Sequence, residues 1–156
     1  MIYQLYLYQI DEHVLENLNH ILFYTIEKSI KSYRQFAQRQ IAAAGFDITI
    51  DQWLVLKTIE EDSTATQQQM AAKVFKDMAS MTRIVELLVR KNYLLRKFNT
   101  SDRRRFDLEL TATGKNLLQQ IQPLIVSNRS TALKGISDEN LQILQSELEK
   151  ITSNVQ

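Results

Sequence analysis

Three consecutive arginines, Arg103, Arg104 and Arg105, form the most concentrated positive charge in the sequence. Adjacent guanidinium groups repel one another and gain little from their proximity unless an anion approaches. Arginine suits phosphate because its planar fork donates parallel hydrogen bonds, and it also enters narrow minor grooves, where negative potential is concentrated. We therefore interpret these arginines as a phosphate-binding group aimed at a minor groove, with Asp102 as the ion-pair partner of one of them.

The charge around this group is strongly biased. From Lys73 to Arg105 the sequence holds ten basic and three acidic residues, a net charge of +7, whereas the whole chain carries +1 and the remainder therefore −6. Such asymmetry concentrates positive potential on one part of a molecule, as phosphate binding requires. An ordinary solvated charged face is the alternative that charge alone leaves open.

A second group with binding chemistry lies near the start of a predicted helix over residues 78–91. The apolar residues of this segment form one stripe, and the side chains near its start that do not suit the stripe are Ala79, Ser80, Thr82 and Arg83. Arg83 could donate two hydrogen bonds to a guanine, the two hydroxyls could meet bases or phosphates, and the alanine could lie against a thymine methyl. The alternatives are solvent exposure for the hydroxyls and an ion pair with Glu86 for Arg83.

Other chemistry finds little support in the residue types. The absence of cysteine excludes disulfides, thiolate metal sites and thiol nucleophiles. His13 and His20, with Glu16 between them, could hold a metal on one helix face, but a surface or dimer-interface role fits them better. Because the sequence also has no glycine-rich phosphate loop and no nucleophile-elbow motif, we expect no enzyme activity, no cofactor and no metal site.

The elements that carry these groups are predicted to be mostly helices, because only three glycines and one proline interrupt the chain. Apolar residues spaced three to four apart predict one long helix over residues 11–44, ending at Gly45. Capping-box pairs, in which a threonine is followed three residues later by a glutamine, predict helix starts at Thr49 and Thr66, the second opening a short helix over 67–73.

The next helix, over 78–91, has Asp77 as its expected N-cap and Asn92 as its left-handed end. Leu94–Phe98 can then be extended, and period-two alternation predicts a strand over Phe106–Leu110, so the two runs are expected to form a hairpin joined by the polar turn that carries the three arginines. Thr111 is the expected cap of a further helix, which Pro123 should bend. The last helix is predicted to begin near Ser137, with leucines at near-heptad spacing.

This order predicts a mainly α fold with a small β-hairpin (α+β). A short helix, a tight turn, a second helix and a basic hairpin match a winged helix-turn-helix, in which the second helix enters the major groove. The N- and C-terminal helices are apolar on one face and longer than the small lobe can cover, so we expect a second copy of the chain to cover them.

The stretch from Asp102 to Gly114 reads Asp-x-Arg, five residues, Leu-Thr, two residues, Gly, and it resembles the wing signature of the multiple antibiotic resistance regulator (MarR) family. Met70-Ala71, Thr82-Arg83 and the stretch Leu88–Leu94 resemble that family's helix-turn-helix and its approach to the wing. The resemblance implies a homodimer with interlocked terminal helices, a palindromic DNA site, and repression relieved by a small ligand.

Two departures from the family pattern are visible. Asn92 stands where the family commonly has glycine, and the tyrosine-rich start, whose role the sequence leaves open, is longer than typical. Neither threatens the fold. The missing cysteine excludes the family's thiol-based peroxide sensing for this chain.

From these observations we expect one MarR-like unit over residues 1–156. A DNA-binding lobe is expected over 46–113, between helical dimerisation regions over 11–44 and 114–156. Four aromatic residues could line a ligand pocket where the first helix meets the lobe, although core packing fits their spacing better; they are Tyr33, Phe36, Phe46 and Trp53.

The expected function is that of a sequence-specific, double-stranded DNA-binding transcriptional regulator, a homodimeric repressor with a small-molecule effector. We expect it in the cytoplasm, because the sequence shows no secretory leader and no apolar run near the ~20 residues that a bilayer span requires. The alternatives are a winged-helix interaction module that uses its basic hairpin on an acidic protein partner, and a small enzyme based on the histidines and carboxylates.

Overall fold

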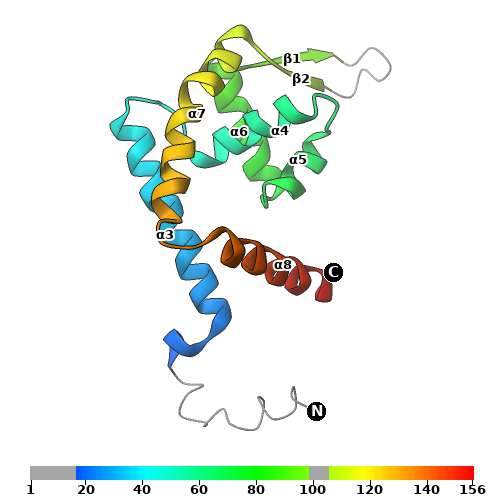
Figure 1. The fold of residues 1–156 in the computed structure, drawn as a ribbon. Helices are drawn as coiled ribbons and strands as arrows, with labels where there is room; N and C mark the ends of the chain where they lie inside the picture. Colours follow the sequence, from blue (N-terminus) through cyan, green and yellow to red (C-terminus); the bar gives the residue numbers. More distant parts are fainter. Residues whose placement is uncertain (1–16, 99–105) are drawn as a thin grey trace.

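The computed structural model describes residues 17–98 and 106–156. This part of the chain forms a mostly helical molecule with one two-stranded hairpin (Figure 1). The predicted fold class is confirmed. None of the helices in the described ranges is long and apolar enough to cross a membrane.

The first long helix is shorter than predicted. A turn of 3-10 helix, η1 (Leu18–His20), is followed by Ile21 in an extended conformation, and α3 covers Leu22–Ala43. The side chain of Asn17 accepts the backbone N–H of Asn19, so it caps η1 locally and competes with a continuous helix. A single helix over 11–44 is therefore wrong within the described residues, whereas the predicted end at Gly45, with φ 80°, is confirmed.

The next three helices follow in the predicted order, and below they are together called the lobe. Helix α4 (Ile50–Glu61) and helix α5 (Gln67–Lys73) each begin with the predicted capping box, in which the threonine and the glutamine satisfy each other's backbone N–H groups. Helix α6 (Met78–Arg90) begins at the predicted cap Asp77. Asn92 ends it with φ 58°, as predicted.

The hairpin has the predicted bounds. Strand β1 (Leu94–Phe98) pairs antiparallel with β2 (Phe106–Leu110), with Leu94 opposite Leu110 and Phe98 opposite Phe106. One face of the hairpin is buried, through Leu94 and Leu108, and its far end extends away from the helices (Figure 1).

Two helices follow the hairpin. Helix α7 (Ala112–Ala132) has the predicted cap, Thr111, and contains Pro123; it lies beside α3 (Figure 1). Helix α8 (Asp138–Asn154), capped by Ser137 as predicted, leads away from the end of α7. It buries none of its residues.

One hydrophobic core joins the lobe to the long helices. Buried residues from every element except η1 and α8 meet in it, and they include Ile41, Leu56, Met70, Met81, Leu88, Leu94, Leu108 and Ile121. The core therefore holds α3, α7 and the hairpin against the lobe, which fixes the surfaces that α6 and the hairpin present.

Candidate nucleic-acid interface

The turn between α5 and α6 is closed by backbone hydrogen bonds. The N–H of Lys76 donates to the carbonyl of Ala71 (2.9 Å) and the N–H of Phe75 to that of Ala72 (3.2 Å), the pattern of a Schellman motif. Phe75 occupies the left-handed position of this motif, with φ 56°, and its side chain is 93% exposed. The geometry gives a short helix, a tight turn and a second helix, which is the helix-turn-helix arrangement.

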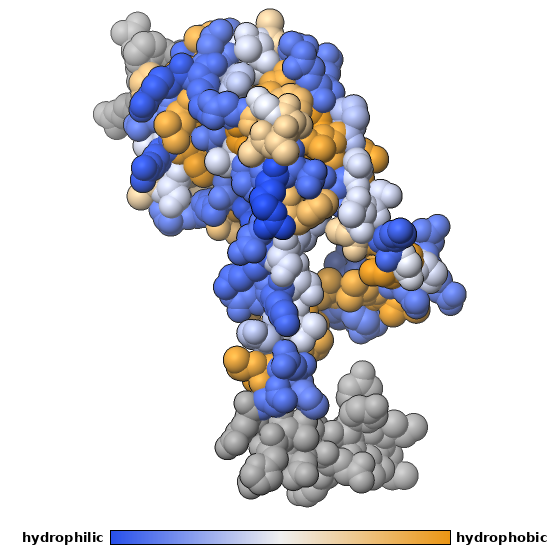
Figure 2. Space-filling model, turned by 90° about the vertical axis from the view of Figure 1, so that its left-hand side faces the viewer, coloured by the Kyte–Doolittle hydropathy of each residue, from blue (hydrophilic) through white to orange (hydrophobic). Residues whose placement is uncertain are grey.

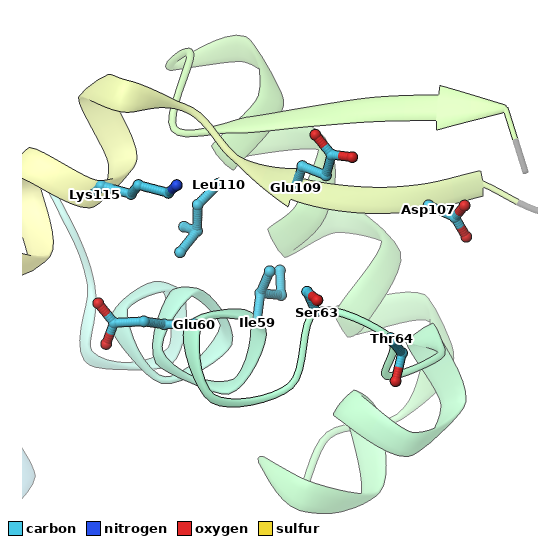
Figure 3. A pocket seen from close by; sticks show the side chains of 8 residues that line it. All are labelled: Ile59, Glu60, Ser63, Thr64, Asp107, Glu109, Leu110 and Lys115. Atoms are coloured by element: carbon cyan, nitrogen blue, oxygen red, sulfur yellow. The ribbon is translucent and has the colours of Figure 1, made fainter.

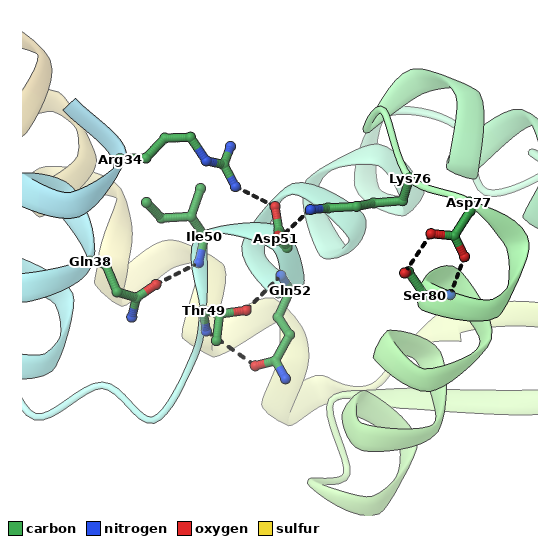
Figure 4. Close-up of polar contacts among 9 residues, drawn as sticks. All are labelled: Arg34, Gln38, Thr49, Ile50, Asp51, Gln52, Lys76, Asp77 and Ser80. Atoms are coloured by element: carbon green, nitrogen blue, oxygen red, sulfur yellow. Dashed lines mark hydrogen bonds and ion pairs between the residues drawn. The ribbon is translucent and has the colours of Figure 1, made fainter. Parts of the chain in front are cut away.

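Asp77 fixes the start of α6. Its carboxylate accepts the backbone N–H of Ser80 (2.8 Å) on one oxygen and the Ser80 hydroxyl (2.7 Å) on the other (Figure 4). The backbone hydrogen bond, followed by the hydroxyl bond, holds the pKa of Asp77 below its ordinary value. Ser80, a predicted DNA contact, is half-buried, and its hydroxyl proton is engaged by this cap.

The other predicted residues of α6 lie on its outer surface. Ala79, Thr82 and Arg83 are exposed within the first two turns of the helix. The Thr82 hydroxyl donates to the carbonyl of Met78 (2.8 Å), which leaves its oxygen lone pairs free to accept. Arg83 does not form the ion pair with Glu86 that its spacing allowed. The structure thus presents a methyl, a hydroxyl and a guanidinium without an ion-pair partner among the described residues, together on the face of α6 away from the core.

The hairpin follows α6 in the sequence, and hydrogen bonds fix its base to the end of that helix. Thr111 donates its hydroxyl to the carbonyl of Asn92 (2.6 Å) and accepts the N–H of Gly114 (3.0 Å), so the end of α6, the base of the hairpin and the start of α7 are tied together. On the exposed face of the strands, Lys97 pairs with Glu109 at 2.5 Å. The predicted phosphate-binding residues Arg103, Arg104 and Arg105, with Asp102, lie outside the described residues.

A polar network links the lobe to α3. Asp51, in the first turn of α4, accepts from Arg34 of α3 on one carboxylate oxygen and lies 2.9 Å from the Lys76 ammonium on the other (Figure 4). Gln38, one turn after Arg34, donates to the carbonyl of Ile48 (3.2 Å) and accepts the N–H of Ile50 (3.0 Å). Sequence reasoning missed this network, because residues 17 and 25 positions apart give no periodic signal.

The ionisation of Asp51 reflects this position. Partial burial acts to raise the pKa of its carboxyl, but the hydrogen bonds from Lys76 and Arg34 outweigh burial, and the pKa lies below its ordinary value. Asp51 is therefore a carboxylate at neutral pH, held by one cation from α3 and one from the turn before α6.

A groove between α4 and β2 has the opposite character (Figure 3). Glu60, Asp107 and Glu109 line this cavity of about 620 Å³ together with Lys115. The lining lacks the excess of positive charge that a phosphate-binding surface needs, although Lys57 and Lys97 pair with Glu60 and Glu109 from outside it. The groove is therefore no part of the candidate nucleic-acid interface.

The four aromatic residues considered for a ligand pocket have different surroundings. Tyr33 and Phe36 line a cavity of about 310 Å³ between α3 and the end of α7. Trp53 is only 7% exposed and belongs to the core, with the Arg129 guanidinium 5.9 Å from the centre of its ring, and Phe46 packs against the same core. The first two thus adjoin a cavity, and the other two serve packing.

The residues considered for a metal site are only partly described. His20 is exposed in η1, whereas His13 and Glu16 lie outside the described residues. Within residues 17–98 and 106–156, no group of three or more metal-ligating side chains occurs.

The arrangement of α5, the turn, α6 and the hairpin defines the winged helix-turn-helix class. Residues 48–106 match the model of the MarR family. The chain is 25% identical over 148 residues to the transcriptional regulator SarZ of Staphylococcus haemolyticus, covering 93% of this chain and 88% of that one. The chain is therefore similar to MarR-family regulators, through the family model over residues 48–106 and through SarZ over most of its length.

Two further comparisons agree with this similarity. SarZ of Staphylococcus epidermidis is 29% identical over 97 residues, and the chain spans 62% of that relative's length. Among solved structures, the MepR–DNA complex of Staphylococcus aureus has a TM-score of 0.75 at 20% identity, covering 88% of this chain and 99% of MepR. At that identity the likeness concerns the fold.

Proposed function

We propose that the protein is a homodimeric transcriptional regulator that binds double-stranded DNA in a sequence-specific manner. The observation that carries the proposal is the outer face of α6, where Ala79, Thr82 and Arg83 are exposed in the first two turns beyond the Asp77 cap. The N-terminal part of the second helix of this motif is the part that meets base edges in the major groove. Regulator names among the relatives support this role and give no sign of catalysis.

The hairpin supplies the second contact of the proposed interface. Its connection, residues 99–105, carries Arg103, Arg104 and Arg105. Arginines on such a connection can enter the minor groove beside the major-groove helix and neutralise the flanking phosphates. A regulator of this kind works at the chromosome, so we place it in the cytoplasm of a cell like those of its bacterial relatives.

The proposed dimer follows from apolar surface that the monomer leaves open. Leu22 and Phe23 at the start of α3, and Ile143 and Leu144 on α8, are each about half exposed or more. Figure 2 shows apolar side chains gathered at the lower end of α3 and on α8. An apolar surface of this extent on two protruding helices is typical of a subunit interface.

A small-molecule effector is the third part of the proposal. The cavity beside Tyr33 and Phe36 lies where α3 meets α7, so a ligand there would act on the angle between the long helices and the lobe. The chain has one tryptophan, Trp53, and its fluorescence can report binding. Titration with a panel of aromatic acids should change this fluorescence and weaken DNA binding in parallel.

The experiment that tests DNA binding is a salt series. Duplexes selected from a random pool are bound at increasing salt, and about four phosphate contacts per subunit predict a slope near −7 in log K against log salt. Replacing Arg103 and Arg104 with alanine should weaken binding to all duplexes and flatten the slope. Absence of duplex affinity at low salt would reject the proposal and favour an acidic protein as the partner of the hairpin.

A further inference from the structure

The side chain of Asp51 connects α3 to the turn before α6. Its two oxygens are occupied by cations from two different parts of the molecule, Arg34 on α3 and Lys76 in the turn before α6. The Asp51 side chain is 28% exposed, compared with 49% for Glu61, whose ion pair with Lys73 lies wholly within the lobe. Asp51 therefore links α3 to the turn before α6 through ion pairs that are partly shielded from solvent.

Lys76 connects Asp51 to the start of α6. Its backbone N–H closes the end of α5 by donating to the carbonyl of Ala71 (2.9 Å), and the next residue, Asp77, is the cap of α6. The lysine is thus held by α5 through its backbone and by Asp51 through its side chain. A displacement of α3 that moved Arg34 and Asp51 would pull directly on the first turn of α6.

A second attachment makes α3 and the start of α4 move together. Gln38 bonds the backbone on both sides of Thr49, by donating to the carbonyl of Ile48 and by accepting the N–H of Ile50, the second of which Figure 4 shows. Since α3 also carries the exposed residues Leu22 and Phe23, the same helix has an end available to a partner and an end fixed to the lobe. The distance between the two recognition helices of a dimer is then set through this attachment.

We propose that Asp51 is a positioning residue for DNA recognition, which ties Arg34 of α3 to Lys76 and thereby sets the orientation of α6 relative to α3. The inference rests on the proposed function. It makes Asp51 responsible for the match between the dimer and the spacing of its half-sites, with no contact of its own to DNA.

The first test needs no DNA. Because the chain has no cysteine, spin labels can be placed through Ser32→Cys on α3 and Glu86→Cys on α6, with labelled protein co-folded in an excess of unlabelled protein. Asp51→Asn should broaden the distribution of distances between the labels. Glu61→Gln, which removes one carboxylate charge and one ion pair inside the lobe, should leave it unchanged. An unchanged distribution in Asp51→Asn would overturn the proposal.

The second test measures spacing. Duplexes selected by the wild-type protein are altered by inserting two base pairs between the half-sites, and the affinity ratio of the two duplexes is the readout. Asp51→Asn should reduce this ratio about tenfold, within the usual range of coupling between sites, while affinity for a single half-site stays as in the wild type. Glu61→Gln should preserve the ratio.

These outcomes distinguish a failure of the proposed DNA-binding function from a failure of the positioning role of Asp51. A wild-type protein that binds no duplex would reject the proposed function, and the label distances would still decide the role of Asp51. A wild-type protein that binds, with an unchanged ratio in Asp51→Asn, would overturn the positioning role alone. If Asp51→Asn fails to fold by circular dichroism, Arg34→Gln and Lys76→Gln each break one half of the link and should shift both readouts in the same direction.

Discussion

A Cβ atom on Gly114 would lie 2.2 Å from the carbonyl oxygen of Tyr93. The first turn of α7 therefore passes directly over the backbone that leads from α6 into β1, and the carbonyl cannot move aside as a flexible side chain would. Thr111 adds to this contact by donating its backbone N–H to the same carbonyl (3.2 Å). The glycine of the wing signature is thus a packing requirement at the base of the hairpin.

Gly114→Ala should consequently destabilise the protein. We expect a loss of about 1–3 kcal/mol, the usual cost of forcing an extra carbon into a packed site. Thr113→Ala, at the neighbouring exposed position, is the control and should change the melting temperature little. Urea unfolding of both variants checks the prediction, and equal stability of the two would contradict it.

Arg83→Ala should mainly reduce sequence discrimination. A bidentate contact to guanine contributes about 1–3 kcal/mol of discrimination, so the ratio of specific to random-duplex affinity should fall by roughly tenfold or more. Arg90→Ala removes the same charge at the other end of α6, about 10 Å along the helix at 1.5 Å per residue, and should leave the ratio intact. Equal losses of specific and random affinity in Arg83→Ala would reject a base-reading role.

Leu144→Lys should dissociate the proposed dimer. Leu144 lines an apolar groove of about 670 Å³ on α8, together with Leu133, Leu141 and Leu148. A lysine there would place a charge in the interface, whereas Ser146→Lys adds the same charge on the opposite side of the helix, 200° away at 100° per residue. Light scattering should show a smaller particle for the first variant only. A wild-type monomer at micromolar concentration would remove the dimer from the proposal.

The contribution of Asp51 to stability should depend on pH. Because its pKa in the folded protein lies below the ordinary value of 3.8, the contribution is present above that value and is lost as the pH falls through the lower pKa. Asp51→Asn should therefore be less stable than the wild type at pH 7, and the difference should shrink below about pH 4. Urea unfolding from pH 7 to pH 3 measures this difference. A constant gap across the series would show that the carboxylate charge is not what stabilises the link.

Much of the fold was predictable because it depends on local signals. Thr49, Thr66, Asp77 and Thr111 each cap a helix with their own side chain, and these bonds span only three residues. The second strand followed from alternation, and the left-handed position of Asn92 from its place after the apolar stripe of α6. Such signals can be recognised in the sequence without knowing which residues pack against each other in the core.

The failures concern one local break and contacts between distant parts of the chain. The break at Ile21 was missed because the apolar spacing continues across it, while the cap at Asn17 makes a local turn instead. The bonds of Asp51 to Arg34 and Lys76 were missed because helix packing, rather than spacing, brings these residues together. Of the predicted site, α6 could be placed and the hairpin arginines lie outside the described residues.

Helix α8 has 17 residues, and the described part of its own subunit buries none of them fully. An isolated helix of that length is marginal in water, so we expect the partner subunit of the proposed dimer to supply much of the free energy that holds α8 in place. By mass action the melting temperature should then rise with protein concentration, and dilution alone should loosen this end of the chain. The amount of protein in a cell would in that way become part of what determines its shape.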